Sequence, residues 1–158
     1  MHGYETDTVT KLETNLDDCP AEILGAVLEQ LFAAGALDAW FTPIQMKKHR
    51  PGVMLSILCE DAAVPALADL VFAETTAFGL RTERVVRLKL ARHFEDVPTP
   101  YGSVRVKLGL KGDKVVQFSP EFESCRDAAT RAGVPIREVY AATLRARPPA
   151  GMQTAPVA

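Results

Sequence analysis

The sequence lacks several features that would assign it to a common class of protein. No apolar run approaches the ~18 residues of a membrane-spanning helix, and no signal peptide is recognisable. The only three cysteines, Cys19, Cys59 and Cys125, have no CxxC spacing, so we expect free thiols in a reducing cytoplasm. Glycine-rich phosphate loops, dinucleotide-binding glycine motifs, and Cys–His or Ser–His–Asp arrangements are also missing. The sequence therefore indicates neither a membrane protein nor a disulfide-stabilised secreted domain.

The net charge is small as well, at −2, and this predicts neither nucleic-acid binding nor attraction to a membrane. The charges are unevenly distributed, however. Residues 1–40 contain eight acidic residues and a single lysine, whereas residues 41–158 contain twelve acidic residues and seventeen lysines and arginines. The acidic start and the basic middle could face each other across one site, although ordinary neutralisation of a protein surface would give the same pattern.

What the sequence does have is enough apolar residues, 47% of 158, for one domain with a real core. Hydrophobic patterns predict strands at about 7–14, 37–46, 53–59 and 80–93, and helices at about 20–34 and 61–74. This β-α-β-β-α-β order is the split pattern of a ferredoxin-like sandwich, in which two helices cover one face of a four-stranded antiparallel sheet. The predicted fold class is therefore α+β.

The rest of the chain is predicted to extend the same unit. Two strands in the range 102–118 form a hairpin that adds to the sheet, Ser119 and Pro120 begin a helix that ends at Gly133, and a last short helix follows. The proline-rich end has nothing to pack and is predicted to be disordered. The expected organisation is a ferredoxin-like core at 1–94, a hairpin and two-helix extension at 95–146, and a disordered tail at 147–158.

Oxygen-bearing side chains gather where the first strand runs into the first helix: Glu13, Thr14, Asn15, Asp17 and Asp18. A helix start uses one carboxylate as a cap, for which Asp18 is the candidate, but it does not use three. Three carboxylates with an amide and a hydroxyl are ligands that Mg or Mn prefers. Spacing alone leaves two interpretations open, a metal site and a helix cap on an acidic surface turn.

A basic turn, Lys47-Lys48-His49-Arg50, separates the second and third strands. Lysine ammonium groups and the arginine fork suit a polyphosphate. A solvated turn that discourages pairing of sheet edges would be basic too.

Two further stretches carry polar groups that could bind a ligand. Thr75 and Thr76 leave the second helix shortly before Arg81, and Arg105 and Lys107 alternate along a later strand. Both patterns also have a structural explanation. Threonine commonly ends helices, and the solvent-exposed face of a half-buried strand is often basic.

The combination of these stretches is more specific than any one of them. Six segments of this chain resemble, in order and spacing, the C-terminal half of the LarC family of nickel-insertion proteins. These segments are ETNLDDCPAE, PIQMKKHRPG, ETTAFGLR, TPYGSVRVK, SPEFESCRDAA and GVPIREVY. The resemblance covers about residues 11–146. It implies a cyclometallase activity that inserts nickel into pyridinium-3,5-bisthiocarboxylic acid mononucleotide, completing the nickel-pincer cofactor of lactate racemase, while CTP is cleaved to CMP and pyrophosphate.

The resemblance also implies partners and roles for residues. An N-terminal nickel-binding portion of the family would be a partner, and the chain is expected to form a homo-oligomer. Lys47 and Lys48 are candidate catalytic residues, and Mg or Mn would accompany CTP. The candidate nucleotide-binding residues are Lys47, Lys48, Arg50, Thr75, Thr76, Arg81 and Arg105, and the candidate metal ligands are Glu13, Asp17 and Asp18. The alternative is a non-catalytic ferredoxin-like module for oligomerisation or small-ligand binding, because a fold does not dictate a function.

Overall fold

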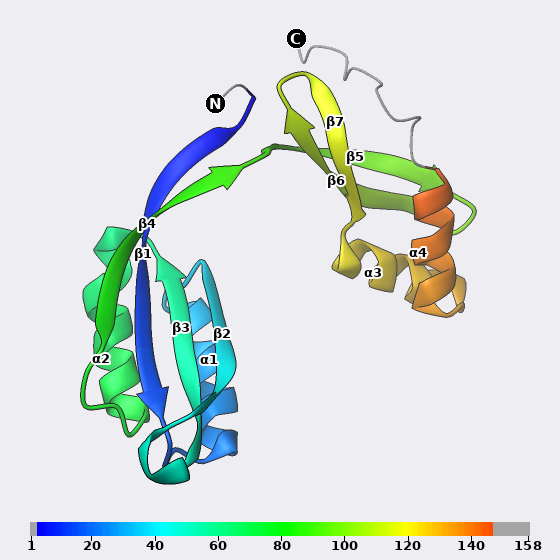
Figure 1. Ribbon diagram of the computed structural model, residues 1–158. Helices are drawn as coiled ribbons and strands as arrows, with labels where there is room; N and C mark the ends of the chain where they lie inside the picture. Colours follow the sequence, from blue (N-terminus) through cyan, green and yellow to red (C-terminus); the bar gives the residue numbers. More distant parts are fainter. Residues whose placement is uncertain (1–2, 147–158) are drawn as a thin grey trace. The chain divides into compact units, whose positions relative to one another are not determined.

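The computed structural model describes residues 3–146, which form two compact units (Figure 1). The first unit is Thr6–Arg87, and the second combines residues 3–5 with residues 88–146. The helices and strands are β1 (Glu5–Leu16), α1 (Ala21–Ala33), β2 (Asp38–Gln45), the short 3-10 helix η1 (Lys47–His49), β3 (Pro51–Cys59), η2 (Asp61–Ala63), α2 (Val64–Glu74), β4 (Arg81–Lys89), β5 (Ala91–Thr99), β6 (Gly102–Lys111), β7 (Lys114–Pro120), α3 (Phe122–Ala132) and α4 (Ile136–Arg145).

The first unit has the predicted ferredoxin-like architecture. Its four strands lie in the order β2-β3-β1-β4, β3 pairs antiparallel with both β1 and β2, and α1 and α2 lie on one face (Figure 1). Residues three or four apart on each helix meet alternate residues of the strands. The fully or nearly buried side chains that result are Leu12, Leu16, Leu24, Val27, Leu31, Leu55, Ile57, Leu67 and Val71.

The starts of the two helices differ from the prediction. No side chain caps α1, whose N-cap residue is Pro20, so the interpretation of Asp18 as a helix cap is wrong. Asp61, the first residue of the second predicted helix, does not cap α2 either. Its carboxylate instead accepts hydrogen bonds from the Thr10 hydroxyl at 2.5 Å and from Arg84 at 2.7 Å. Asp18 likewise accepts a hydrogen bond from a distant residue, Thr76. Local spacing in the sequence does not show such long-range contacts.

The second unit is a separate three-stranded antiparallel sheet, in the order β5-β6-β7, with α3 and α4 packed against it (Figure 1). The prediction that the hairpin extends the first sheet is therefore wrong. The single strand predicted at 80–93 is in fact β4 and β5, divided at Leu90, and each half belongs to a different sheet. Alternation of side chains continues through this point without a glycine or proline, so the pattern contains no signal for the change of sheet.

Three details of the second unit complete the comparison with the prediction. The helix expected to start at Ser119 starts at Phe122, because Ser119 still pairs with Lys107 in the β6–β7 ladder. The predicted end at Gly133 is confirmed, with this glycine in the left-handed conformation at φ 66°. The expected boundary at residue 94 falls inside β5, and the tail 147–158 lies outside the described residues.

No helix of the described residues is long and apolar enough to cross a membrane. The three cysteines are free, with Cys59 and Cys125 buried and Cys19 half-buried.

Candidate functional site

A groove of about 470 Å³ lies at one end of the ferredoxin-like sheet. Its lining residues are Thr14, Asn15, Asp17, Asp18, Met46, Lys47, Arg50, Thr76, Phe78, Gly79 and Arg81. The strand register explains why these segments meet. The end of β1 lies level with the start of β3 (Leu16 opposite Val53), and the end of β2 lies level with the same start (Gln45 opposite Pro51). The loop before β4 reaches the same end of the sheet.

Two carboxylates line the groove, and each contacts a group from a distant segment. One Asp17 oxygen lies 3.4 Å from an Arg50 guanidinium nitrogen. Asp18 accepts a hydrogen bond from the Thr76 hydroxyl. The acidic first segment and the basic turn of the sequence therefore meet at this groove.

Glu13, the third predicted metal ligand, does not line the groove. It points to the helix-free face of the sheet, where it accepts a hydrogen bond from Ser56 at 3.3 Å and pairs with Lys11 at 3.3 Å. No group of three or more His, Cys, Asp or Glu side chains in residues 3–146 is arranged to hold a metal ion. The groove thus contains two carboxylates, Asp17 and Asp18, and not all three of the predicted metal ligands. Two suffice for Mg when a substrate's phosphate oxygens supply other ligands.

The basic turn supplies two lysines that no acidic residue of the described chain neutralises. Lys47 lines the groove, and neither Lys47 nor Lys48 has an ion pair among the described residues. Lys48 lies in the same turn but outside the lining of the groove. Only Arg50 of this turn is paired, with Asp17.

The backbone of this turn is strained. Lys48 and His49 have φ values of 59° and 58°, in the left-handed region that side chains with a Cβ rarely adopt. The cost is about 1 kcal/mol for each residue. A hydrogen bond of 2.8 Å from the Met46 amide to the Arg50 carbonyl closes the turn. Strained backbone of this kind gathers at binding sites, where surrounding structure holds it in place.

Gly52 is a site-forming residue that the sequence analysis did not single out. A Cβ atom at this position would lie 2.7 Å from the Leu16 carbonyl oxygen and 3.4 Å from the Asp17 Cα atom. Only a glycine therefore lets the start of β3 approach the end of β1, where Asp17 enters the groove. The motif Arg-Pro-Gly indicates a turn, but it does not indicate this close approach.

The loop between α2 and β4 forms the third side of the groove. The Thr14 hydroxyl donates a hydrogen bond of 2.9 Å to the Gly79 carbonyl, which fixes the loop to β1. Arg81 donates to the Asn15 side-chain oxygen at 2.8 Å. Thr75 does not line the groove, because its hydroxyl donates to the Val71 carbonyl at 2.7 Å and so serves the end of α2.

Phe78, in the same loop, is a second residue that the sequence analysis missed. Its side chain is fully exposed although it lines the groove. A large apolar ring in water gains nothing from the hydrophobic effect, and a ligand bound in the groove would cover this ring.

Arg105, the last predicted nucleotide-binding residue, belongs to β6 in the second unit. Its guanidinium lies 4.8 Å from the centroid of the Phe94 ring. The candidate residues that the first-unit groove brings together are therefore Asp17, Asp18, Lys47, Arg50, Thr76 and Arg81.

The groove of this ferredoxin-like unit gathers two carboxylates, the unpaired Lys47, and two arginines, Arg50 and Arg81, that pair with Asp17 and Glu13. Such a set of groups can bind a phosphate-bearing molecule together with a divalent cation. Comparison with known proteins gives the family. The model of the family described as nickel insertion protein matches residues 1–140, and the chain belongs to this family. The resemblance to LarC proteins seen in the sequence is confirmed.

Individual relatives agree with this assignment. The chain is 49% identical over 138 residues to a nickel insertion protein of Myxococcus xanthus, described as putative, covering 87% of this chain and 35% of the relative. It is 42% identical over 140 residues to the pyridinium-3,5-bisthiocarboxylic acid mononucleotide nickel insertion protein of Acetivibrio thermocellus, covering 89% of this chain and 34% of that protein. The chain thus spans about a third of the length of these relatives.

A solved structure matches nearly the whole chain. It is LarC2, the C-terminal domain of a cyclometallase involved in the synthesis of the NPN cofactor of lactate racemase, in its apo form. The TM-score is 0.84 at 42% sequence identity, and the match covers 90% of this chain and 98% of that domain. A protein of Methanopyrus kandleri has a related fold, with a TM-score of 0.62 at 29% identity and 86% of each chain covered.

Proposed function

We propose that this chain is the C-terminal, CTP-binding module of a nickel insertase that places nickel into pyridinium-3,5-bisthiocarboxylic acid mononucleotide and completes the nickel-pincer cofactor of lactate racemase. CTP is cleaved to CMP and pyrophosphate in the proposed reaction. The name of the Acetivibrio relative supports the substrate, and the LarC2 structure supports the assignment to the C-terminal part. Because the match covers only 34% of the Acetivibrio protein, the N-terminal portion of the family is the proposed partner.

The observation that carries the proposal is the meeting of two carboxylates and three cationic side chains in one groove. Lys47 and Arg50 come from the basic turn and Arg81 from the start of β4, far apart in the sequence, and all three line the same space. Lys47 has no ion pair in the described chain, so its ammonium group can pair with a phosphate without breaking an internal ion pair. Arginine and lysine together suit a polyphosphate, since the guanidinium fork binds two oxygens and the ammonium acts as a point charge.

The donor set also fits Mg or Mn. Asp17 and Asp18 are hard oxygen ligands at the edge of the cationic groove, and Thr76 adds a hydroxyl. When bound with CTP, the divalent cation would supply neutralisation of negative charge on the triphosphate. Asp17 would exchange its contact with Arg50 for this role and leave that guanidinium for the phosphates.

The chain's own contribution to CTP cleavage is positional and electrostatic. Lys47, with Lys48 beside it in the turn, would stabilise the charge that develops on the departing pyrophosphate. The strained, closed turn would keep these ammonium groups in place before the nucleotide arrives, so little reorganisation is required. Nickel and the pyridinium mononucleotide are substrates in this scheme.

Thermal unfolding with each of the four nucleoside triphosphates, with and without Mn, tests the proposal. A ligand present at about 100 times its dissociation constant should add roughly 2.7 kcal/mol to the free energy of unfolding. We expect this effect for CTP with Mn, and a much smaller effect for ATP and GTP. Equal stabilisation by all four triphosphates, or by none, contradicts the proposal and favours a non-catalytic interaction module.

Homo-oligomerisation remains part of the proposal. The face of the first sheet opposite α1 and α2 carries Trp40, which the register places beside Ser56 and Glu13 on that face. Trp40 is partly exposed, and tryptophan is enriched at interfaces between proteins. Sedimentation of the chain with and without CTP determines the oligomeric state, and a monomer under both conditions would remove this part of the proposal.

A further inference from the structure

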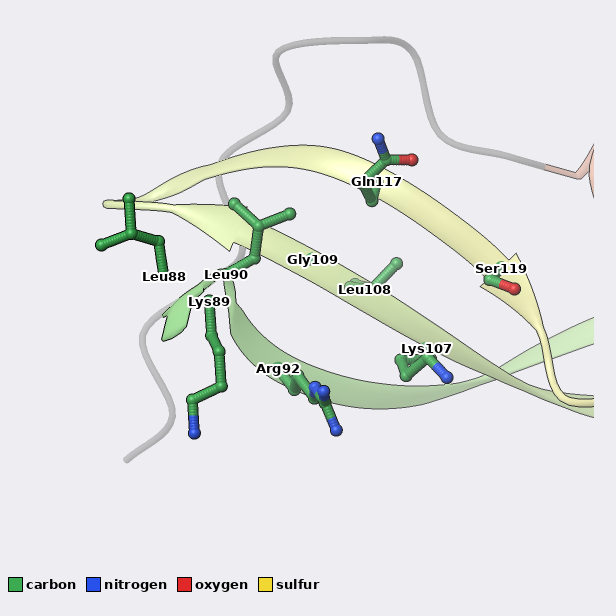
Figure 2. Close-up of a pocket in the computed structure, with 9 residues that line it drawn as sticks. All are labelled: Leu88, Lys89, Leu90, Arg92, Lys107, Leu108, Gly109, Gln117 and Ser119. Carbon is green, nitrogen blue, oxygen red and sulfur yellow. The ribbon is translucent and has the colours of Figure 1, made fainter. Parts of the chain in front are cut away.

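The second unit has a groove of its own, of about 290 Å³, which the proposed function does not use. Figure 2 shows the residues around it, which come from the end of β4 and from β5, β6 and β7. They are Leu88, Lys89, Leu90, Arg92, Lys107, Leu108, Gly109, Gln117 and Ser119.

The strand register places four polar side chains of this groove on the same face of the sheet. Arg92 and Gln117 both lie opposite Gly109, and Ser119 lies opposite Lys107. Residues directly opposite each other across antiparallel strands share a face. On the other face of β6, Val104 is buried under α3 and α4, and Val106 and Leu108 are buried in a separate cluster with Val97 and Phe118. The groove therefore lies on the face that these helices leave open, and in Figure 2 the charged ends of Arg92 and Lys107 lie on the same side of the β5–β6 pair.

Gly109 gives this face its shape. A Cβ atom there would lie 2.8 Å from a Leu90 methyl carbon and 2.9 Å from the Gln117 Cβ atom, so a larger residue would displace both walls. The β6–β7 register shifts between Gly109 and Leu110. Such bulges change the direction of side chains and are frequent beside binding sites.

Most polar groups of the groove have no partner within the part of the chain that the structure describes. Arg92, Gln117 and Ser119 form no side-chain hydrogen bond or ion pair among residues 3–146. Lys107 pairs with Glu121 at 3.2 Å, but both side chains are more than a third exposed. An exposed pair of this kind contributes at most about 1 kcal/mol, so a ligand can share the lysine at small cost.

We propose that this groove is a second ligand site that binds an anionic pyridinium mononucleotide, the substrate class of the proposed function, apart from CTP. The inference rests on that function for the identity of the ligand. Arg92, Lys107 and Ser119 bind the phosphate, and the apolar walls Leu88 and Leu90 pack against the ring. An arginine fork, a lysine ammonium group and the Ser119 hydroxyl opposite that lysine supply the donors and positive charge that suit a terminal phosphate.

The charge balance supports a multiply charged anion. Arg92 and Lys107 are basic residues of the lining, which contains no acidic residue, and Lys107 also pairs with Glu121 outside the lining. In a pyridinium mononucleotide with two thiocarboxylates, the thiocarboxylates and the phosphate are negatively charged. The single positive charge of the pyridinium nitrogen offsets only part of this charge. The volume matches the lower end of small-molecule pockets, which begin at about 300 Å³.

Calorimetric titration of the whole chain with pyridinium-3-carboxylic acid mononucleotide, a close chemical analogue of the substrate, tests the site. Arg92→Gln removes the charge and keeps some hydrogen-bonding capacity, and Arg131→Gln is the matched control on α3, where Arg131 is exposed and unpaired among the described residues. We expect Arg92→Gln to weaken binding of the mononucleotide at least tenfold, while Arg131→Gln has no effect. CTP binding with Mn should be the same in both variants, and thermal unfolding should confirm that both are folded.

The outcomes separate this inference from the proposed function. If Arg92→Gln binds the mononucleotide like wild type, or if no mononucleotide binding is detected, the inference is wrong even where CTP binds as proposed. If the mononucleotide is displaced by CTP and is lost in Lys47→Ala instead, there is one site and the inference is also wrong. Binding that depends on Arg92 in a chain that fails to bind CTP would support this site and contradict the CTP proposal alone.

Discussion

At the scale of single residues, the charges of the first-unit groove differ in how firmly the chain already holds them. Lys47 has no ion pair in the described structure, whereas Asp17 faces Arg50 and Asp18 accepts from Thr76. A free cation can bind a ligand without losing an internal contact, and a paired carboxylate must exchange one contact for another. Substitutions at these positions should therefore have distinguishable effects.

Lys47→Ala should weaken CTP binding more than CMP binding, because CMP lacks the two outer phosphates that the ammonium group would contact. The change should alter unfolding free energy by no more than about 0.5 kcal/mol, as for most surface positions. The loss of affinity should shrink at higher salt, since screening already weakens the wild-type contact. Titration of both nucleotides at two salt concentrations measures this. Lys114→Ala, an exposed and unpaired lysine in the second unit, is the control and should bind like wild type.

Asp17→Asn with Asp18→Asn should abolish the dependence of nucleotide binding on Mn. The amides keep the size of the side chains and can still accept from Thr76, but they remove both negative charges. Because neither aspartate caps α1, the melting temperature without ligand should barely change. Manganese titrations of wild type and the double variant decide the point. An unchanged response to Mn would mean that these carboxylates do not hold the cation.

Phe78→Ala should weaken CTP and CMP binding by the same factor, in contrast to Lys47→Ala. The exposed ring lines the groove, and stacking of a base on an aromatic side chain contributes about 1–3 kcal/mol, or roughly 5-fold to 160-fold in affinity. Both nucleotides carry the same base, so both should lose it. Phe78→Trp should retain binding. A loss confined to CTP would argue against stacking.

At the scale of elements, the groove depends on how closely the start of β3 approaches the end of β1. Gly52→Ala would place a methyl group 2.7 Å from the Leu16 carbonyl, a backbone atom that cannot rotate away. We expect a loss of roughly 1–3 kcal/mol in unfolding free energy, together with weaker CTP binding as the basic turn shifts from Asp17. Urea denaturation and nucleotide titration of the same variant measure both effects.

Gly25→Ala is the matched control for this experiment. Gly25 is an exposed residue of α1 with nothing within 4 Å of the added methyl group, so the helix should gain about 0.5–1 kcal/mol. Destabilisation by both substitutions would show that close approach at Gly52 is not the cause.

The central parts of the elements follow from hydrophobic period, whereas their ends follow from it only where pairing with a distant strand does not intervene. The i, i+3, i+7 spacing of Leu24, Val27 and Leu31 predicts α1 to within a residue at each end. The start of α3 is predicted wrongly, because Ser119 and Pro120 resemble a helix start while strand pairing with β6 keeps them in β7. Backbone hydrogen bonds to a distant strand outweigh a local capping signal.

At the scale of the whole molecule, alkaline pH should lower stability. Burial raises the pKa of the Cys59 and Cys125 thiols, and hydrogen bonds to Glu83 and Glu13 raise the pKa of Lys11. In each case the folded state keeps its proton to higher pH than the unfolded state does. The unfolded state therefore binds fewer protons above the ordinary thiol pKa of about 8.5, and the free energy of unfolding falls as pH rises.

Urea denaturation at about pH 7.5 and about pH 10, followed by fluorescence, measures this loss. The single tryptophan, Trp40, lies in the first unit and reports on the unit that contains Cys59 and Lys11. Cys59→Ala removes one titrating thiol, so its stability should depend less on pH than that of wild type. Equal stability at the two pH values would contradict the assignment of these raised pKa values.

The sequence by itself determined the ferredoxin-like order of elements, the approximate positions of the helices and of every strand except β5, and the family. These follow from short-range patterns, since hydrophobic period reports which face of an element is buried, and from motifs in a fixed order. It also indicated the acidic stretch and the basic turn as candidate partners, although their roles in binding stay predictions.

Only the tertiary structure decided which of these side chains share one space. Strand register brings Asp17 and Asp18 to Lys47 and Arg50, while Glu13, one strand position from Thr14, points to another face of the sheet. The structure also divided the continuous pattern at Leu90 between two sheets, and so gave the second unit an open face with Arg92 and Lys107. Strand register and the choice of sheet depend on pairing between segments tens of residues apart. Local hydrophobic patterns show which face of a strand is buried, but not which strand it pairs with.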